Sequence, residues 1–326
     1  MLHTYASVGG CLVQRAGIDS RPEITDTTLW VDLVDPTPAE DAVVETALGI
    51  SIPTRAEARE IEASSRLYRE NGAVYMTAFV LYNADAEVPD GATVTFVLTA
   101  RHLVTIRYHE PRAFPLFATR AAKGEVECTS APMVLIGLIE TIVERAADII
   151  ERTQDAVETT ARRIFTANRE SRNYARRLDE VLRAVGRQGD ITARLEESAF
   201  SLERVLSYLL AALRERGESA STLARLDTAQ RDVRSLAEQM RFLMDRITFL
   251  LDATLGAISI EQNRTMKVFS LVAATLMPPT LIAAIYGMNF KHMPELEWLS
   301  GYPMALGLMV VAALLPFLYF RRKGWL

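Results

Sequence analysis

The chain has 326 residues, a net charge of −5, a mean hydropathy of +0.09, two cysteines and four histidines. These values exclude a uniformly hydrophobic transporter, a basic nucleic-acid-binding protein and a disulfide-stapled secreted domain. The apolar excess is concentrated near the C-terminus, and the residues before Val268 resemble those of a charged, mainly helical protein with its own core. The N-terminus lacks a charged start followed by an apolar run, so we expect no secretory signal and a cytosolic first part.

Residues 1–130 are predicted to form an α+β domain. Residues 29–34 are apolar enough for a strand, and Asp35-Pro36-Thr37 then predicts a helix that Thr37 caps with Glu40 and that ends at Gly49. A second helix is expected after Pro53. Three further strands are predicted as a meander, at residues 73–81, 93–99 and 103–108.

No nucleotide-binding loop, catalytic triad or metal-hydrolase motif occurs in this region, so we expect no enzyme active site. His102 and His109 stand at strand boundaries and are expected to be surface or turn residues.

Residues 131–218 are predicted to form two long antiparallel helices, because apolar residues follow helical spacing and charges fill the other faces. Gly186 and Gly189, followed by Asp190, are interpreted as the break between the two helices. The face of the first helix is formed by Leu135, Leu138, Ile139, Ile142, Val143 and Ala146.

Residues 219–290 contain no proline before Pro278 and are predicted to form one continuous rod, of which the roughly 60 residues up to Pro278 would span about 90 Å. Apolar residues in its first half recur at steps of seven, three and four, which is typical of packing against another helix. A soluble coiled coil gives the same pattern and is compatible with a stalk. The residues are Leu226, Val233, Leu236, Met240, Leu243, Ile247 and Leu250.

Two segments without charged residues, 268–290 and 298–320, are predicted to span a membrane. The first would rise about 35 Å as a helix, enough to cross a hydrocarbon layer of about 30 Å. Arg264 and Lys267 precede the first span, and a basic tail, 321–326, follows the second. The distribution of positive charge places both termini in the cytosol and the loop 291–297 outside.

One face of the first span is small, polar or flexible, whereas the flanking positions are bulky and apolar. Small residues in a membrane helix commonly form a packing surface for another helix. Alternatively, several copies of this helix around an axis would line a pore. The stripe consists of Asp252, Gly256, Ser259, Asn263, Met266, Ser270, Ala273, Met277, Thr280, Ala284 and Gly287.

The end of this span carries Tyr286-Gly287-Met288-Asn289, and Met293-Pro294-Glu295-Leu296 follows in the loop. With these motifs between two C-terminal spans, the chain resembles the CorA family of magnesium and cobalt channels. The N-terminal region adds to the resemblance through Trp30-Val31-Asp32-Leu33, Asp35-Pro36-Thr37 and Ser65-Arg66-Leu67-Tyr68. The resemblance implies a homo-oligomeric funnel, a pentamer, with a central pore. Lys291, where many members carry an acidic residue, and the second proline, Pro279, depart from the family pattern.

The resemblance also implies roles for single residues. Asn289, with Gly287 and Met288, would form the selectivity filter at the outer mouth; an asparagine there is otherwise typical of a helix C-terminal cap. Glu295 and Glu297 would concentrate cations in the external loop. The pore lining and gate would include Thr280, Met277, Ser270, Phe269, Met266, Asn263 and Asp252, with Phe269 one step off the stripe.

The predicted function is passive influx of hydrated Mg²⁺, with Co²⁺ and Ni²⁺ as alternative ions, through a multi-pass protein of the cell membrane. Mg²⁺ would also be regulatory, with Asp227, Asp232 and Glu60 as candidate cytosolic ligands in the closed state. A zinc transporter of the same superfamily and a membrane-tethered helical scaffold without a pore are the alternatives. The partners expected are other copies of the chain and the lipid bilayer, with no nucleic acid.

Overall fold

The computed structural model describes residues 1–15, 24–60, 62–84, 86, 89–166, 173–289, 293–294 and 298–324. The chain separates into two compact units. The first unit comprises Met1–Ala167 and Glu180–Leu251, and the second unit comprises Asn168–Asp179 and Asp252–Leu326.

The described strands of the first unit form one mixed seven-stranded sheet in the order β2-β1-β3-β7-β6-β5-β4. Neighbouring strands are antiparallel except β3 and β7, which are parallel, with Trp30 opposite Leu103. The predicted strand and meander are confirmed as β3, β5, β6 and β7, whereas the sequence pattern did not predict β1, β2 and β4. The bounds are Leu2–Val8 (β1), Cys11–Arg15 (β2), Thr28–Val34 (β3), Leu67–Glu70 (β4), Ala73–Leu81 (β5), Gly91–Leu98 (β6) and Leu103–Arg107 (β7).

Helix α1 (Pro38–Leu48) has the predicted ends. The Thr37 side chain accepts from the Glu40 amide, and the Glu40 carboxylate accepts from the Thr37 amide at 2.8 Å, which completes a capping box. Gly49 closes the helix with a φ of 65°, a left-handed conformation that glycine adopts without a side-chain clash.

The helix predicted after Pro53 is only the short turn η2 (Glu57–Arg59). Thr54 and Glu57 cap this turn, with the Thr54 amide donating to the Glu57 carboxylate at 2.8 Å. However, Glu60 leaves the helical conformation after the short turn η2 (Glu57–Arg59), and the Arg66 side chain donates to its carbonyl at 2.6 Å. Only the one-turn helix α2 (Ala63–Arg66) separates this turn from β4. A helical turn therefore begins after Pro53, as predicted, but the chain leaves it at Glu60. The bond between Arg66 and the Glu60 carbonyl could not be predicted from the sequence.

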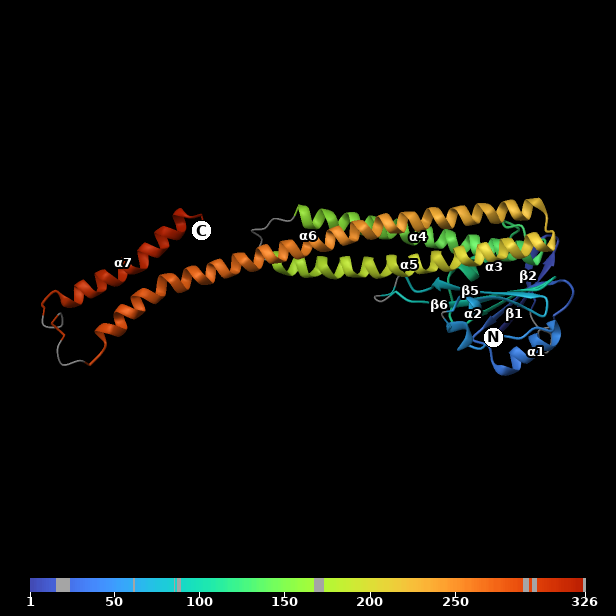
Figure 1. Cartoon of the computed structure of the whole chain (residues 1–326), viewed down its shortest axis with the longest axis horizontal. Coiled ribbons are helices and arrows are strands. Elements are labelled where there is room, and N and C mark those ends of the chain that lie inside the picture. Colours follow the sequence, from blue (N-terminus) through green and yellow to red (C-terminus); the bar gives the residue numbers. More distant parts are fainter. Residues whose placement is uncertain are drawn as a thin grey trace. The chain divides into compact units, whose positions relative to one another are not determined.

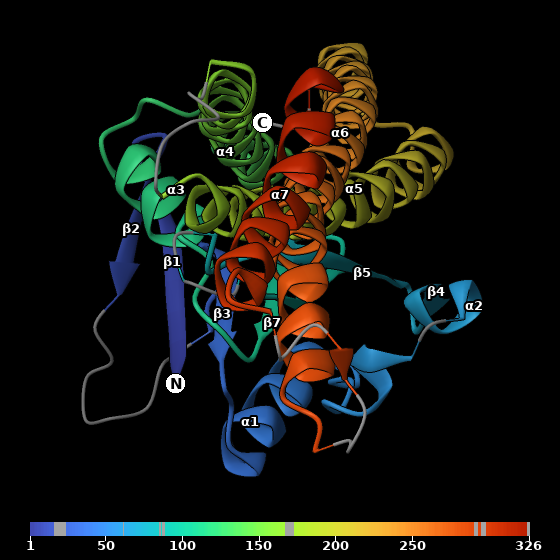
Figure 2. The ribbon, with the colours of Figure 1, turned by 90° about the vertical axis from the view of Figure 1, so that its left-hand side faces the viewer.

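Figures 1 and 2 show three long helices beside one another in the first unit: α4 (Ala131–Phe165), α5 (Tyr174–Arg216) and the first part of α6 (Ala220–Tyr286). The predicted break at Gly186 and Gly189 is wrong, because both glycines lie inside α5. A β-carbon at Gly189 would lie 3.6 Å from a methyl of Ile247 on α6, so glycine is accommodated at a helix contact. At Gly189 packing thus outweighs the cost of about 1 kcal/mol for a glycine in a helix, whereas a β-carbon at Gly186 would have no neighbour within 4 Å.

Helices α5 and α6 are antiparallel in this bundle. Gln230 donates to Ser207 at 2.7 Å, and Arg234 donates to Glu203 at 2.6 Å, so the residue number rises on one helix as it falls on the other. The apolar seam predicted on α6 is confirmed as a helix-packing face, since all its members are buried or, for Leu236, half-buried. The seam contacts helices of the same chain.

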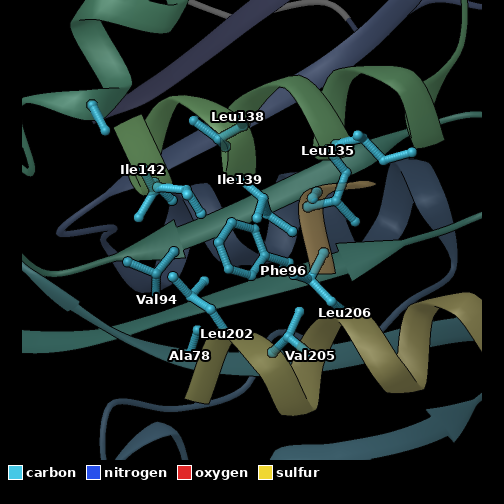
Figure 3. Close-up of a cluster of buried hydrophobic side chains, with 14 of the residues drawn as sticks. Ala78, Val94, Phe96, Leu135, Leu138, Ile139, Ile142, Leu202, Val205 and Leu206 are labelled. Atoms are coloured by element: carbon cyan, nitrogen blue, oxygen red, sulfur yellow. The ribbon is translucent and has the colours of Figure 1, made fainter. Parts of the chain in front are cut away.

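The bundle covers one face of the sheet. Figure 3 shows Phe96 of β6 among Leu135 and Ile139 of α4 and Leu202 and Leu206 of α5, all in the same buried cluster. Helix α3 (Ala113–Ala122) adds to this face, and a second cluster around α1 covers the other. Burying each such side chain stabilises the fold by about 1.5–3 kcal/mol, so the first unit has an extensive core of its own.

In the second unit, α6 continues to Tyr286, and α7 extends over Gly301–Arg322. Both helices are long and apolar enough to cross a membrane, and both carry internal prolines, Pro278 and Pro279 in α6 and Pro316 in α7. The predicted fold class is confirmed in its parts: an α/β N-terminal domain, long helices and two C-terminal apolar helices.

Candidate functional site

The small and polar stripe of α6 is exposed along its whole length, from Asp252 to Gly287, in the described chain. The bulky flank is exposed as well, including Val268, Val272 and Leu276. Lipid satisfies an apolar flank, whereas the amide and hydroxyls of the stripe need a polar neighbour or water. The described part of α7 does not cover the stripe, so the packing alternative would need a partner outside this chain.

Two threonines on α6 show how hydroxyls are held in this span. The Thr280 hydroxyl donates to the Leu276 carbonyl at 2.8 Å, and the Thr275 hydroxyl donates to the Leu271 carbonyl at 2.8 Å. Thr280 lies on the stripe and is exposed, whereas Thr275 lies off it and is half-buried. Because the proton of each hydroxyl is used, the Thr280 oxygen presents acceptor lone pairs outward, the polarity that a cation or its water shell requires.

The Gly287-Met288-Asn289 signature lies where α6 ends. The Gly287 amide donates to the Ala283 carbonyl at 3.0 Å, and the Met288 amide donates to the Ile285 carbonyl at 3.2 Å. A β-carbon at Gly287 would lie only 3.1 Å from the Ala283 oxygen, so the close turn favours glycine. Asn289 is exposed, and its backbone is not left-handed, so it does not adopt the cap conformation that was the alternative.

The expected gate residues occupy two faces of α6. Met277 is exposed on the stripe, whereas Phe269 lines a hollow together with Ala175 and Leu178 from the start of α5. Met266 belongs to the stripe and also borders this hollow. Phe269 therefore lies on the side of α6 next to α5, and its role as a gate stays a prediction.

The candidate regulatory residues do not come together within one chain. Asp227 lies 3.8 Å from Arg214, and Asp232 is exposed farther along α6. Glu60 lies in the turn before β4, where it ends η2. No group of three histidine, cysteine or acidic residues suited to a metal ion occurs among the described residues. Glu295 and Glu297 lie outside the described residues.

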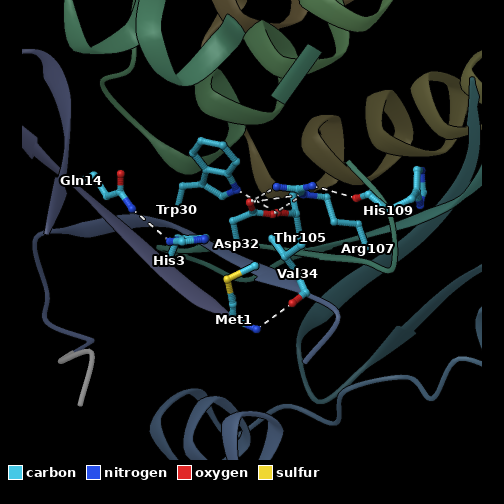
Figure 4. A network of polar contacts seen from close by, with 9 residues as sticks. All are labelled: Met1, His3, Gln14, Trp30, Asp32, Val34, Thr105, Arg107 and His109. Carbon is cyan, nitrogen blue, oxygen red and sulfur yellow. Dashed lines mark hydrogen bonds and ion pairs between the residues drawn. The ribbon is translucent and has the colours of Figure 1, made fainter. Parts of the chain in front are cut away.

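A buried polar network joins β3 to β7 (Figure 4). The Trp30 indole donates to Thr105 at 2.9 Å, the Thr105 hydroxyl donates to Asp32 at 2.6 Å, and Arg107 pairs with Asp32 at 2.8 Å. Asp32 is 1% exposed and Arg107 7%. Because these groups are both partnered and buried, the network anchors the sheet. The Trp30-Val31-Asp32-Leu33 motif thus encodes an internal ion pair.

His109 lies in the bend after β7, as expected, but its ring is half-buried and both ring nitrogens lack a hydrogen-bond partner. It lies 4.7 Å from the Tyr82 ring, centroid to centroid, and Figure 4 shows it at the end of the network beside Arg107. Burial, and then the positive charge of Arg107, lower the pKa of His109 to about 4. The sequence pattern contained no signal for this burial.

The sequence matches the model of the family described as CorA-like Mg²⁺ transporter protein over residues 25–322. The chain belongs to this family. It is 35% identical over 96% of both chains to the magnesium transport protein CorA of Yersinia pseudotuberculosis serotype I, and 35% identical over the full length of both to that of Haemophilus influenzae strain 86-028NP. With its two apolar helices, this member of the CorA-like family is a membrane protein.

Two solved structures share the fold. The CorA magnesium transporter of Methanocaldococcus jannaschii matches with a TM-score of 0.74 and 18% identity, over 100% of this chain and 99% of that one. The cytoplasmic domain of ZntB from Vibrio parahaemolyticus matches with a TM-score of 0.54 and 10% identity, over 80% of this chain and 97% of that one. At these identities the likeness concerns the fold alone.

Proposed function

We propose that the chain forms a homo-oligomeric channel, a pentamer, that carries hydrated Mg²⁺ into the cell through a central pore. The exposed stripe of α6 from Asp252 to Gly287 carries this proposal, because it is a narrow small and polar face on an otherwise bulky apolar helix. The name of the relatives at 35% identity, magnesium transport protein, supports Mg²⁺ as the ion. Co²⁺ and Ni²⁺ are the proposed alternative ions.

Copies of α6 around an axis would turn the stripe into the lining of the pore. No charged residue occurs between Lys267 and Asn289, so the pore acts on the ion through dipoles. Mg²⁺ loses its octahedral water shell reluctantly, and amide and hydroxyl oxygens can contact that shell without removing it. A ring of Asn289 side chains at the outer mouth would select the hydrated ion, and Thr280 would present acceptor oxygens deeper in the pore.

Gating would depend on apolar rings and on charge at the inner end. Met266 and Met277 would close the pore by excluding water, with Phe269 joining after a rotation of α6. Asp252 would hold a hydrated cation at the inner end. With both termini in the cytosol, the membrane potential favours influx of a divalent ion by about 4.6 kcal/mol per 100 mV, so no ATP and no enzymatic step is needed.

Regulation by cytosolic Mg²⁺ would use acidic residues of different copies, with Asp227, Asp232 and Glu60 as candidates. Mg²⁺ that binds the closed arrangement more tightly than the open one shifts the population toward closure. At Asp227 the ion would compete with Arg214, which lies 3.8 Å away in the same chain.

The test is Mg²⁺ influx into proteoliposomes under an inside-negative potential. We expect the full-length protein to carry Mg²⁺ and Asn289→Ala to lose selective influx. Thr280→Val should lower the rate more than Thr275→Val, because the two threonines share the same backbone contact and differ in facing the stripe or not. Equal effects of the two threonine variants would count against a pore along the stripe.

The rival functions give different results in the same assay. Zn²⁺ influx that exceeds Mg²⁺ influx would indicate the zinc transporter. Absence of divalent flux at every potential, with the protein correctly inserted, would indicate a membrane-tethered scaffold. Light scattering of the purified protein determines the number of copies, and a monomer would overturn the channel.

A further inference from the structure

A hollow of about 340 Å³ lies in the first unit between α4 and α5, beside the segment that follows β5. We call it the α4–α5 hollow. Its volume is within the range that is usual for small-molecule sites. More than half of its wall residues are apolar, which suits a ligand with a weakly polar body. The apolar members of the wall are Ala84, Ile149, Ala156, Ala184 and Ile191.

The charged residues among the described members of this wall are both arginines, Arg152 of α4 and Arg187 of α5. A smaller hollow of about 30 Å³ shares two wall residues with it and adds Arg112 and Arg145. Of these four, Arg145 pairs with Asp148 at 2.9 Å. Because the charge that lines the two hollows is positive, the wall favours an anion over a cation.

Both arginines of the α4–α5 hollow are exposed and bonded to the chain. The Arg187 side chain donates to the Ala86 carbonyl at 2.8 Å, and the Arg152 side chain donates to the Asp148 carbonyl at 3.3 Å. A guanidinium has five N–H donors in a planar fork, so it can bond to the chain and to a ligand at the same time. This fork matches the oxygens of a phosphate or carboxylate group.

Gln188 in the same wall has an unused acceptor. Its side chain is 8% exposed, and its amide oxygen is buried without a hydrogen-bond partner in the described chain. Its amide nitrogen donates to Thr160 at 3.3 Å, and the Thr160 hydroxyl donates to the Ala156 carbonyl at 2.8 Å. The Thr160 oxygen therefore accepts, which fixes the nitrogen of Gln188 on that side. An unmade bond of a buried amide is costly, so the oxygen favours an N–H or O–H donor from a ligand.

The hollow is long enough to separate these two features. Its wall includes residues 149–156 of α4 and 184–191 of α5, about 10 Å of each helix. Thr160, which holds Gln188, lies eight residues beyond Arg152, about 12 Å along α4. A single inorganic ion cannot contact both, whereas an elongated ligand with an anionic end and a donor end can.

From this arrangement we infer that the α4–α5 hollow binds a nucleoside monophosphate. The phosphate would lie between Arg152 and Arg187, the flat base would cover the apolar wall, and the exocyclic amine of the base would donate to Gln188. A sugar phosphate suits the wall less well, because each of its hydroxyls would need a partner that apolar side chains do not provide. The inference goes beyond ion transport and depends only on the first unit.

The test is binding of AMP to the solubilised full-length protein, measured by isothermal titration calorimetry in EDTA. Arg152→Gln and Arg187→Gln should each weaken AMP binding by roughly 10-fold, because each removes a hydrogen-bonded charge. Ala184→Trp, which fills the hollow, should abolish binding. The matched control is Arg231→Gln, an exposed arginine of α6 outside the hollow, which should leave the affinity unchanged. Urea midpoints of the variants establish that each one folds.

The role of Gln188 needs a paired measurement. AMP methylated twice on its amine has no N–H to donate and should bind the unchanged protein roughly 10-fold more weakly than AMP. In Gln188→Leu, which removes the acceptor, the two nucleotides should bind with equal affinity.

Three results would overturn the inference. One is that AMP, GMP and CMP all fail to bind at millimolar concentration. Another is competition by inorganic phosphate at the same concentration as AMP, or an equal loss in Arg231→Gln, either of which would indicate a diffuse effect of surface charge. The third is an equal affinity of the unchanged protein for AMP and its methylated form. Because no flux is measured, and Asn289→Ala should bind AMP normally, failure here is distinct from failure of the transport proposal.

Discussion

Most of the apolar side chains in the sheet and helix core of the first unit are buried, whereas most of those on α7 and on the C-terminal half of α6 in the second unit are exposed. Phe96 and Leu206 are 0% exposed, whereas Leu281 and Leu315 are 61% and 63% exposed. The first unit hides these groups within one chain and pairs its buried charges, as Asp32 does with Arg107. The second unit leaves an apolar surface and the small and polar stripe of α6 exposed. The first unit therefore has a hydrophobic core of its own, whereas the apolar side chains of the second unit need contacts with molecules outside the chain.

The buried ion pair gives the largest expected effect in the first unit. Asp32→Ala leaves the Arg107 guanidinium without its carboxylate at a site of 7% exposure, so the free energy of unfolding should fall by about 3–5 kcal/mol. Urea unfolding of the first unit in the solubilised full-length protein, followed by Trp30 fluorescence, measures this change. The control Glu158→Gln disrupts an exposed pair with Arg162, which solvent screens, and should leave the urea midpoint nearly unchanged. An equal loss of stability in the two variants would show that water reaches the Asp32–Arg107 pair.

Replacement of a leucine by alanine should have different effects on stability in the two units. Leu206→Ala removes contacts around Phe96 and should destabilise the first unit by about 2–5 kcal/mol, because a cavity remains. Leu315→Ala on α7 opens no cavity in the chain, since that side chain is 63% exposed, and should leave the urea midpoint unchanged. A comparable shift of the urea midpoint in both variants would contradict the burial of Leu206 and the exposure of Leu315.

His109 should make the first unit sensitive to acid. Its pKa is about 4 in the folded protein and about 6.5, the ordinary histidine value, in the unfolded chain, so the unfolded chain binds more protons between these values. Stability should therefore fall as the pH drops from 6.5 toward 4, by up to about 3 kcal/mol from this residue. In His109→Phe, the urea midpoint should therefore change less between pH 6.5 and pH 4 than in the unchanged protein. If the urea midpoint of His109→Phe falls as steeply between pH 6.5 and pH 4 as that of the unchanged protein, other groups cause the acid sensitivity.

The capping box of α1 gives the smallest effect. Thr37→Ala removes the oxygen that accepts from the Glu40 amide and should cost about 1 kcal/mol. Thr37→Ser keeps this oxygen and serves as the control in the same urea titration. A loss in Thr37→Ser as large as that in Thr37→Ala would show that the methyl group, rather than the cap, stabilises the helix.

Local signals in the sequence determined much of this protein. Thr37 and Glu40 predicted the start of α1, Gly49 predicted its end, and the charge-free segments predicted two apolar helices, because each signal acts within a few residues. The Gly-Met-Asn signature and the Met-Pro-Glu-Leu loop identified the family before any fold was considered, and the family comparison confirmed it.

Only the tertiary structure decided features that depend on contacts distant in sequence. Gly186 and Gly189 both lie inside α5, and at Gly189 the helix packs against Ile247 of α6, which no local rule for glycine contains. The partners of Asp32 lie 73 and 75 residues away on β7, and burial of His109 arises from Tyr82 on another segment. The hollow lined by Ala175, Leu178 and Phe269 likewise combines residues of α5 and α6 that are more than 75 positions apart. Sequence pattern reports the periodicity of one element, whereas burial, charge pairing and hollows arise where several elements meet.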